Sequence, residues 1–460
     1  MLDALMLSRI QFGFVVSFHI LFPAFTIGLA SWLAFLQANY LWKKEQVYQD
    51  LYFFWLKIFA VSFGMGVVSG IVMSFQFGTN WSQLTDAAGN ILGPLLSYEV
   101  LTAFFLEATF LGVMLFGWNR VSPRMHFLST CMVALGTLIS AFWIISANSW
   151  MQSPAGYAIR DGVFYPVDWF SVIFNPSFPY RLIHMVLGAF LATAFVIGGV
   201  SAWYLRRNRH REESHRMLKL ATAFVAIVTP LQILAGDLQG LFVVEHQPAK
   251  LAAMEGHWET ERGAPFVLFG IPDAQAEENH YEVAIPKLGS LILKHDLNAE
   301  VTGLEAFKPK NRPPVAPVFW SFRVMLAIGV AMLILAAASL WAWRRGRLGS
   351  SRPLHRAWMA MIPSGFVAIL TGWFTAEIGR QPYVIYGLLR TSEANSAVSA
   401  GSVATSLTAF ALVYTVIFGA GIWYLLRIVR TGIQPQRPEP SPRAHPTRPL
   451  SATSDSFEEG

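Results

Sequence analysis

Residues 319–343 read FWSFRVMLAIGVAMLILAAASLWAW, and residues 324–343 within them carry no charged side chain. A helix rises about 1.5 Å per residue, so roughly 20 apolar residues cross the hydrocarbon core of a bilayer, which is about 30 Å thick. A helix that is apolar on every face has to be covered on every face. This stretch therefore predicts a membrane-spanning helix.

The whole chain shares this apolar character. Of its 460 residues, 54% are hydrophobic and 13% are charged, whereas an average soluble domain carries about 25% charged residues. A purely soluble fold is excluded, because its surface would need more charge. The single cysteine excludes a disulfide scaffold, and the net charge of +6 suits an anionic membrane surface better than nucleic acid. We expect an all-α integral membrane protein.

Nine stretches are long and apolar enough to span a bilayer. No small-residue cleavage site ends the first stretch, so we interpret it as a retained helix and not as a signal peptide. The nine predicted spans are residues 14–36, 53–78, 94–117, 126–149, 180–204, 217–243, 319–343, 357–378 and 404–427.

Lysine and arginine alternate between rich and poor loops along the chain. The rich loops are residues 37–52, 118–125, 205–216 and 344–356. The poor loops are residues 79–93, 150–179 and 379–403. Cytoplasmic loops carry the excess of positive charge, and loops longer than about 60 residues escape this rule. The alternation predicts a periplasmic N-terminus and a cytoplasmic C-terminus.

Two segments are predicted to lie outside the membrane. Residues 244–318 mix charges with proline and glycine, and they are long enough for a lid or binding loop on the outer face. Residues 431–460 are rich in proline, serine and arginine and are predicted to form a disordered cytoplasmic tail. We expect residues 1–430, with the outer loop, to form one helical domain.

Ionisable side chains inside spans are costly and are functional candidates by default. With the predicted orientation, seven polar or soft side chains from six spans fall in the outer half of the bilayer. These are His19, Glu99, His184, Asp237, Arg323, Met325 and Glu377, and Lys57 and Glu107 are the other ionisable candidates.

Two histidines, a methionine and carboxylates at one depth suit haem iron. An electron-transfer haem takes two protein ligands, commonly His/His or His/Met, whereas an oxygen-reactive haem keeps one position open. His184 and Met325 could fill the first role, and His19 and a carboxylate could each hold a haem with an open face. Arg323 and Arg380 could neutralise haem propionates.

Simpler roles compete with this interpretation. A lone membrane histidine is more often a packing residue, and a methionine in an apolar helix is usually core filler. Glu99 and Glu107 could hydrogen-bond across helices or relay protons. From the chemistry alone a haem-free, proton-coupled transporter stays open beside a haem protein.

Residues 372–382 read GWFTAEIGRQP, which places Trp373, Glu377 and Arg380 on one helix face before Pro382 ends the helix. This segment resembles the G-W-x-x-x-E-x-G-R-Q-P signature of subunit I of cytochrome bd-type quinol oxidases. The resemblance covers residues 1–427. Further segments that carry it are LSRIQFGF at 7–14 with His19, FQFGTNW at 75–81, FFLEATF at 104–110, ANSWMQ at 147–152, KLAAMEGHWET at 250–260, LFGIPD at 268–273 and APVFWSFRVM at 316–325.

The resemblance implies haem ligands. His184 and Met325 would be the axial ligands of a low-spin haem b. His19 and Glu377 would be ligands at a high-spin haem b and a haem d, with the assignment between them open, and Glu99 could approach one of these haems. The remaining cofactor-binding candidates are Arg323, Trp373 and Arg380.

The resemblance also implies an activity. Glu107 with Ser140 matches the family's proton route from the cytoplasm, and Lys250 with Glu255 matches residues associated with quinol oxidation in the outer loop. Such a protein oxidises quinol at the outer face of the bacterial inner membrane and reduces O2 to water, forming a proton gradient without a pump. A b-type electron-transfer subunit without oxygen chemistry is the alternative, beside the transporter.

Two departures from the family pattern affect the cofactors. Tyr383 stands where the motif usually continues with tryptophan, and the outer loop is short. A short loop resembles the cyanide-insensitive branch, in some of whose members haem b replaces haem d. The pattern implies a second large subunit, subunit II, in a heterodimer. It leaves open small single-helix subunits, the quinone type and cyanide sensitivity.

Overall fold

The computed structural model describes residues 3–435, and within that range nine helical spans are long and apolar enough to cross a membrane. The prediction of nine spans is confirmed. Their helices are α1 (Ala4–Lys43), α2 (Gln46–Thr79), α3 (Ser82–Glu99) with α4 (Phe105–Phe116), α5 (Pro123–Gln152), α7 (Phe178–Arg206), α8 (Arg211–His246), α11 (Val315–Arg344), α12 (Arg352–Ala360) with α13 (Ser364–Ile378), and α15 (Ala400–Thr431).

The helices extend well beyond the predicted spans. The first begins at Ala4, where the Asp3 side chain accepts a hydrogen bond from the Met6 backbone N–H at 2.7 Å. An aspartate at this position stabilises the free N–H groups of the first turn. The predicted loop at 37–52 is largely helical, because α1 ends only at Lys43 and α2 begins at Gln46.

Two of the predicted spans are interrupted in the structure. A π-helical segment, η1 (Val100–Phe104), separates α3 from α4, so one extra residue enters the helix between Glu99 and Glu107. The span predicted as 357–378 consists of α12 and α13, with the break at residues 361–363. Pro363 has no N–H to continue the first helix, which explains the break.

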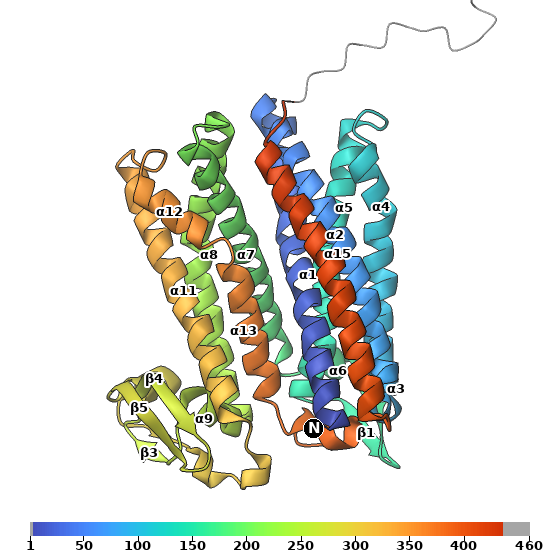
Figure 1. The fold of residues 1–460 in the computed structure, drawn as a ribbon, viewed down its shortest axis with the longest axis vertical. Coiled ribbons are helices and arrows are strands. Elements are labelled where there is room, and N and C mark those ends of the chain that lie inside the picture. The colour runs from blue at the N-terminus through green and yellow to red at the C-terminus, as the bar shows by residue number, and fades with distance from the viewer. Residues whose placement is uncertain (1–2, 436–460) are drawn as a thin grey trace, which may run out of the picture.

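The helices stand side by side in two groups (Figure 1). Helices α7, α8, α11, α12 and α13 form one group, and helices α1 to α5 with α15 form the other. Contacts of α7 with α1 and α5 join the groups. The largest apolar core includes Trp55, Phe195 and Trp358 and lies near the loops rich in arginine.

The small elements and the N-terminal end lie together at the opposite end of the bundle (Figure 1). Each sheet there is an antiparallel pair of strands. The pairs are β1 (Tyr157–Arg160) with β2 (Val163–Pro166), β3 (Glu261–Arg262) with β6 (Glu300–Val301), β4 (Phe266–Asp273) with β5 (Glu278–Ile285), and β7 (Tyr383–Ile385) with β8 (Leu389–Arg390). The short helices are α6 (Trp169–Ile173), α9 (Pro248–Glu255), α10 (Leu288–Lys294), η2 (Leu304–Ala306), η3 (Pro309–Asn311) and α14 (Thr391–Ala394).

The segment between α8 and α11 forms the connection predicted as the outer loop, and it lies at the same end as the N-terminal end of the chain, as the alternation of loops requires. Of the predicted tail, residues 436–460 lie outside the described residues.

Candidate functional site

Glu377, in the last turn of α13, is held by side chains from three parts of the chain. Arg380 donates to its carboxylate at 2.5 Å, and Arg181 on α7 lies 3.8 Å from it. Asn148 and Gln152, one turn apart on α5, donate to the same carboxylate at 3.1 and 3.2 Å. Arg181 also donates to the side-chain oxygen of Asn148. We call these five residues the outer cluster.

The two guanidinium groups of the outer cluster include N–H groups that make no hydrogen bond within the described residues. Within residues 3–435, Nε of Arg181 and both Nε and Nη1 of Arg380 are buried without a hydrogen-bond partner. A buried donor left unpaired costs about 1–3 kcal/mol. The cluster also holds two guanidinium groups against a single carboxylate, so it fits an additional anion. The carboxylate of a haem propionate has the required charge and acceptors.

Lys250 on α9 is attached to this cluster. Lys250 is 3% exposed, and its side-chain nitrogen donates to the side-chain oxygen of Gln152 at 2.6 Å. Burial and the nearby Arg181 hold the pKa of Lys250 well below its usual value, although Glu377 acts in the opposite direction. The structure therefore brings the predicted quinol residue Lys250 and the predicted haem ligand Glu377 to the same place.

Glu255 and Arg323, by contrast, pair with each other at 2.9 Å. Arg323 also donates to the backbone oxygens of Val267 at 2.6 Å and Met254 at 3.2 Å, and its guanidinium lies 4.6 Å from the Phe319 ring centroid. The guanidinium of Arg323 is thus already hydrogen-bonded to the outer loop. Contact of Arg323 with a propionate stays a prediction, whereas its contact with Glu255 fixes the loop to α11.

His184 and Met325 lie in the group of α7, α8, α11 and α13, which pack on one another. The imidazole of His184 is 3.3 Å from the Gln232 amide. A Cβ added at Gly236 would lie 3.2 Å from His184 Cε1, and one added at Gly372 would lie 2.8 Å from the sulfur of Met325. Each predicted ligand thus faces a glycine on the neighbouring helix.

His19 follows the same pattern in the other group of helices. Its Nδ1 lies 3.1 Å from the Ser69 hydroxyl, and a Cβ added at Gly70 on α2 would lie 3.1 Å from its ring. A glycine lets a flat macrocycle approach the helix backbone. The three glycines and the unpaired guanidinium donors make these residues a fit for haem.

Trp373 lies on α13 directly after Gly372 and is half-buried, with its ring centroid 5.6 Å from that of Phe374. A role against a porphyrin face stays a prediction.

The predicted proton-relay residues lie on α3, α4 and α5. Ser140 donates to the Glu99 carboxylate at 2.7 Å. Glu107 is 6% exposed, and a Cβ added at Gly136 would lie 2.5 Å from its Cγ. Both carboxylates therefore face α5, but the serine predicted as the partner of Glu107 bonds to Glu99.

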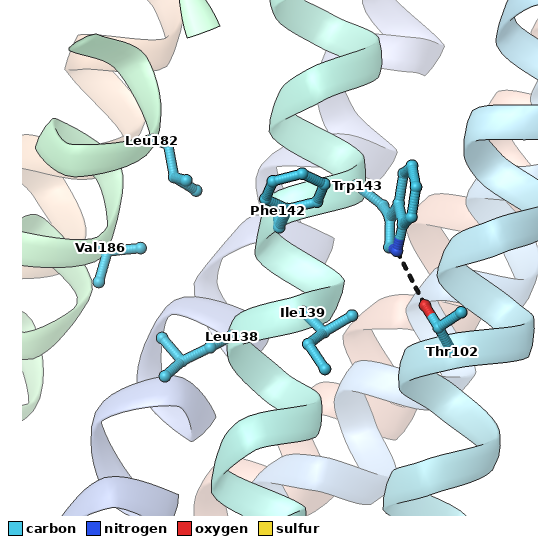
Figure 2. A pocket seen from close by; sticks show the side chains of 7 residues that line it. All are labelled: Thr102, Leu138, Ile139, Phe142, Trp143, Leu182 and Val186. Atoms are coloured by element: carbon cyan, nitrogen blue, oxygen red, sulfur yellow. Dashed lines mark hydrogen bonds between the residues drawn. The ribbon is translucent and has the colours of Figure 1, made fainter. Parts of the chain in front are cut away.

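An apolar groove of about 490 Å³ opens between side chains of η1, α5 and α7 (Figure 2). It is lined by Thr102, Leu138, Ile139, Phe142, Trp143, Leu182 and Val186. The Trp143 indole donates to the Thr102 hydroxyl at 2.8 Å, as the dashed line in Figure 2 shows. No charged side chain lines the groove, so it suits an apolar occupant and not a polar substrate.

Sequence reasoning missed three members of the outer cluster. Arg181 precedes His184 by three residues, and Asn148 and Gln152 are four apart in the quoted segment ANSWMQ. Helical spacing around the predicted ligands was the available signal, because residues three or four apart share a face.

Comparison with known proteins identifies the family. The family model for cytochrome bd terminal oxidase subunit I matches residues 7–433. Cytochrome bd ubiquinol oxidase subunit 1 of Bacillus subtilis (strain 168) is 35% identical over 94% of this chain and 95% of that protein. Cytochrome bd-II ubiquinol oxidase subunit 1 of Escherichia coli (strain K12) is 34% identical over 94% of this chain and 97% of that protein.

The solved structures agree with this comparison. The bd oxidase from Geobacillus thermodenitrificans matches with a TM-score of 0.87 and 31% identity, over 93% of this chain and 99% of that chain. Sequence, fold and family model thus agree over nearly the whole length of the chain. The chain belongs to the cytochrome bd terminal oxidase subunit I family.

Proposed function

We propose that quinol is oxidised beside the outer cluster and that its electrons pass to haem groups held by His19, His184, Met325 and Glu377. The chain is the haem-bearing catalytic subunit of a terminal quinol oxidase, a multi-pass protein of the bacterial inner membrane. Its reaction converts two quinols and one O2 into two quinones and two waters. When bound, the haems supply the one-electron transfers and the O2 chemistry.

The outer cluster is the observation that carries this proposal. It joins Lys250, in the loop that resembles the family's quinol-binding segment, to Glu377 through one side chain, Gln152. Lys250 would bind the quinol hydroxyl and accept its proton. Glu255, fixed by Arg323, would form the second contact with quinol.

The haem ligands are assigned by chemistry and position. His184 and Met325 would hold a low-spin haem b, and His19 and Glu377 would serve the high-spin haem b and haem d, with haem b able to replace haem d. Arg380 and Arg181 supply unpaired N–H groups for propionates. Trp373 and Arg323 would complete the surroundings of the haems.

Glu107, Glu99 and Ser140 would carry protons to the oxygen site. The Ser140–Glu99 hydrogen bond of 2.7 Å supports this, because a hydroxyl and a carboxyl can exchange a proton. The arginine-rich loops would face the cytoplasm and the N-terminal end and outer loop the periplasm. Residues 1–430 would form the haem-binding domain and residues 431–460 a cytoplasmic tail.

Members of this family work in multi-subunit complexes with quinol and O2 as substrates. We propose subunit II as the partner of this chain in a heterodimer, with small single-helix subunits as further candidates. Exposed apolar side chains on α15, such as Leu412 and Trp423, offer a face that lipid or such a partner covers.

Replacement of Met325 by leucine tests the ligand assignment. Leucine keeps the packing volume but removes the thioether, so the reduced low-spin absorption band is expected to disappear while the protein still assembles. Met332→Leu is the matched control, because Met332 lies buried in the apolar core of the same helix. An unchanged band in Met325→Leu would show that Met325 is not a ligand. Pyridine haemochrome analysis of both variants counts the haems and separates b from d.

A further inference from the structure

Gln152 occupies the centre of the contact between the outer loop and the helix bundle. It is the last residue of α5 and is 2% exposed. Its side-chain oxygen accepts hydrogen bonds from Lys250 at 2.6 Å and from Gln247 at 3.2 Å. Its side-chain nitrogen donates to Glu377 at 3.2 Å and to the backbone oxygen of Ala376 at 3.1 Å. The oxygen of this amide thus bonds to the outer loop, and its nitrogen bonds to α13.

An amide is chemically suited to this position. An ammonium offers only donors and a carboxylate offers only acceptors, whereas an amide offers one end of each kind. Glu377 has its ion pairs with Arg380 and Arg181, so Gln152 is the side chain that stands between this carboxylate and Lys250. The backbone oxygen of Gln152 accepts a further bond from Gln247 at 2.7 Å, which ties the start of α9 to the end of α5.

We propose that Gln152 is a positioning residue for quinol oxidation. Its oxygen orients the amino group of Lys250 toward quinol, and its nitrogen orients the carboxylate of Glu377 on the haem side. The inference rests on the proposed function, in which Lys250 binds quinol and Glu377 ligates haem. Gln152 acts through these two residues and is not itself a catalytic residue.

Two variants of the purified, haem-loaded complex separate the two ends of the amide. Gln152→Met keeps the length of the side chain and removes both ends. We expect its KM for quinol to rise about tenfold, because the hydrogen bond to Lys250 is lost, and the haem absorption spectrum to shift, because the donor to Glu377 is lost as well. Gln152→Glu keeps an acceptor for Lys250, loses the donor to Glu377 and places a like charge beside that carboxylate. We expect its KM for quinol to stay within about twofold and the haem absorption spectrum to shift.

Asn148→Leu is the matched control, since Asn148 donates to the same Glu377 oxygen from the same helix and has no contact with Lys250 among the interactions of the described residues. We expect it to shift the haem spectrum without raising the KM for quinol. A general loosening of the α5 end would instead raise KM in all three variants, and that result would overturn the inference. If Gln152→Met does not assemble with haem, Gln152→Asn is tested in its place, because its shorter side chain cannot reach both partners.

A double-mutant cycle with Lys250→Ala distinguishes failure of this inference from failure of the proposed function. If Gln152 acts through Lys250, adding Gln152→Met to Lys250→Ala raises the KM for quinol no further. Additive effects would overturn the inference and leave the role of Lys250 intact, as would an effect of Lys250→Ala with none of Gln152→Met. An unchanged KM in Lys250→Ala would remove the quinol role of Lys250 and the inference together.

Discussion

Two groups of carboxylates in this protein have opposite surroundings. Glu377 is bonded to the guanidinium of Arg380, lies within 4 Å of a second guanidinium and accepts two amide N–H groups. Glu99 accepts a hydrogen bond from the hydroxyl of Ser140, and Glu107 packs across Gly136. All three carboxylates are at least half-buried in the helix bundle. They therefore differ in their ion-pair and hydrogen-bond partners and not in their burial.

This difference in partners indicates a division between two roles, a fixed anion and a proton relay. A carboxylate held by two permanent cations is fixed in position and stays an anion, which suits a ligand or the partner of a bound group. A carboxylate next to a hydroxyl can gain or lose a proton without breaking an ion pair, which suits a relay.

Glu377→Gln is expected to have the largest effect. Removing the charge leaves the buried guanidinium groups of Arg380 and Arg181 without their carboxylate, and breaking a buried ion pair costs about 3–5 kcal/mol. Thermal unfolding and haem content, measured together, should both fall. Glu99→Gln is the control, and we expect it to lose about 1 kcal/mol, because it loses no ion pair. Equal losses in the two variants would refute the division.

Glu107→Gln is expected to slow O2 consumption about a hundredfold while haem content and thermal stability stay normal. An amide fills the same space across Gly136 but cannot pass on a proton, and loss of a proton-transferring group typically costs 10²–10⁴ in rate. Oxygen uptake with excess quinol measures the effect. Full turnover would remove Glu107 from the proton route and leave Glu99 and Ser140 as the candidates.

Lys250 predicts how quinol oxidation depends on pH. Burial and the nearby Arg181 lower its pKa, so more of it is neutral at a given pH than of an ordinary lysine, and a neutral amine can accept the quinol proton. We expect kcat/KM for quinol to rise as pH rises through this lowered pKa, by at most about tenfold per pH unit. Lys250→Arg should flatten the profile, since a guanidinium stays protonated. An unchanged profile would assign the proton acceptor elsewhere.

The sequence predicted the spans well, because apolar length and the placement of arginine report directly on the bilayer. It did not show the π-helical segment at Val100–Phe104, which packs against α5. Proline at position 363 gave a local signal for the break between α12 and α13, but the apolar pattern continues across it.

The sequence likewise predicted only some of the residues of the candidate site. His19, His184, Met325 and Glu377 stood out because such side chains are rare or chemically distinctive inside apolar helices. Asn148 and Gln152 are neutral, and Arg181 lies near a helix end where arginine is common, so none of them departs from what a membrane helix tolerates. Helical spacing places Arg181 on the face of His184, and Asn148 on the face of Gln152, but their contacts with Glu377 depend on how α5, α7 and α13 pack.

Gly372→Ala is expected to have the smallest effect. An added methyl group would lie 2.8 Å from the Met325 sulfur, but that sulfur is near the end of a flexible side chain and can move aside. We therefore expect the low-spin absorption band to shift and weaken without the complete loss expected for Met325→Leu. Gly329→Ala, on the same helix as Met325, is the control, because an added Cβ there has no atom within 4 Å among the described residues. A wild-type spectrum in Gly372→Ala would show that the thioether is held away from this glycine in the haem-loaded protein, which would contradict the contact between Gly372 and Met325 as a determinant of the low-spin site.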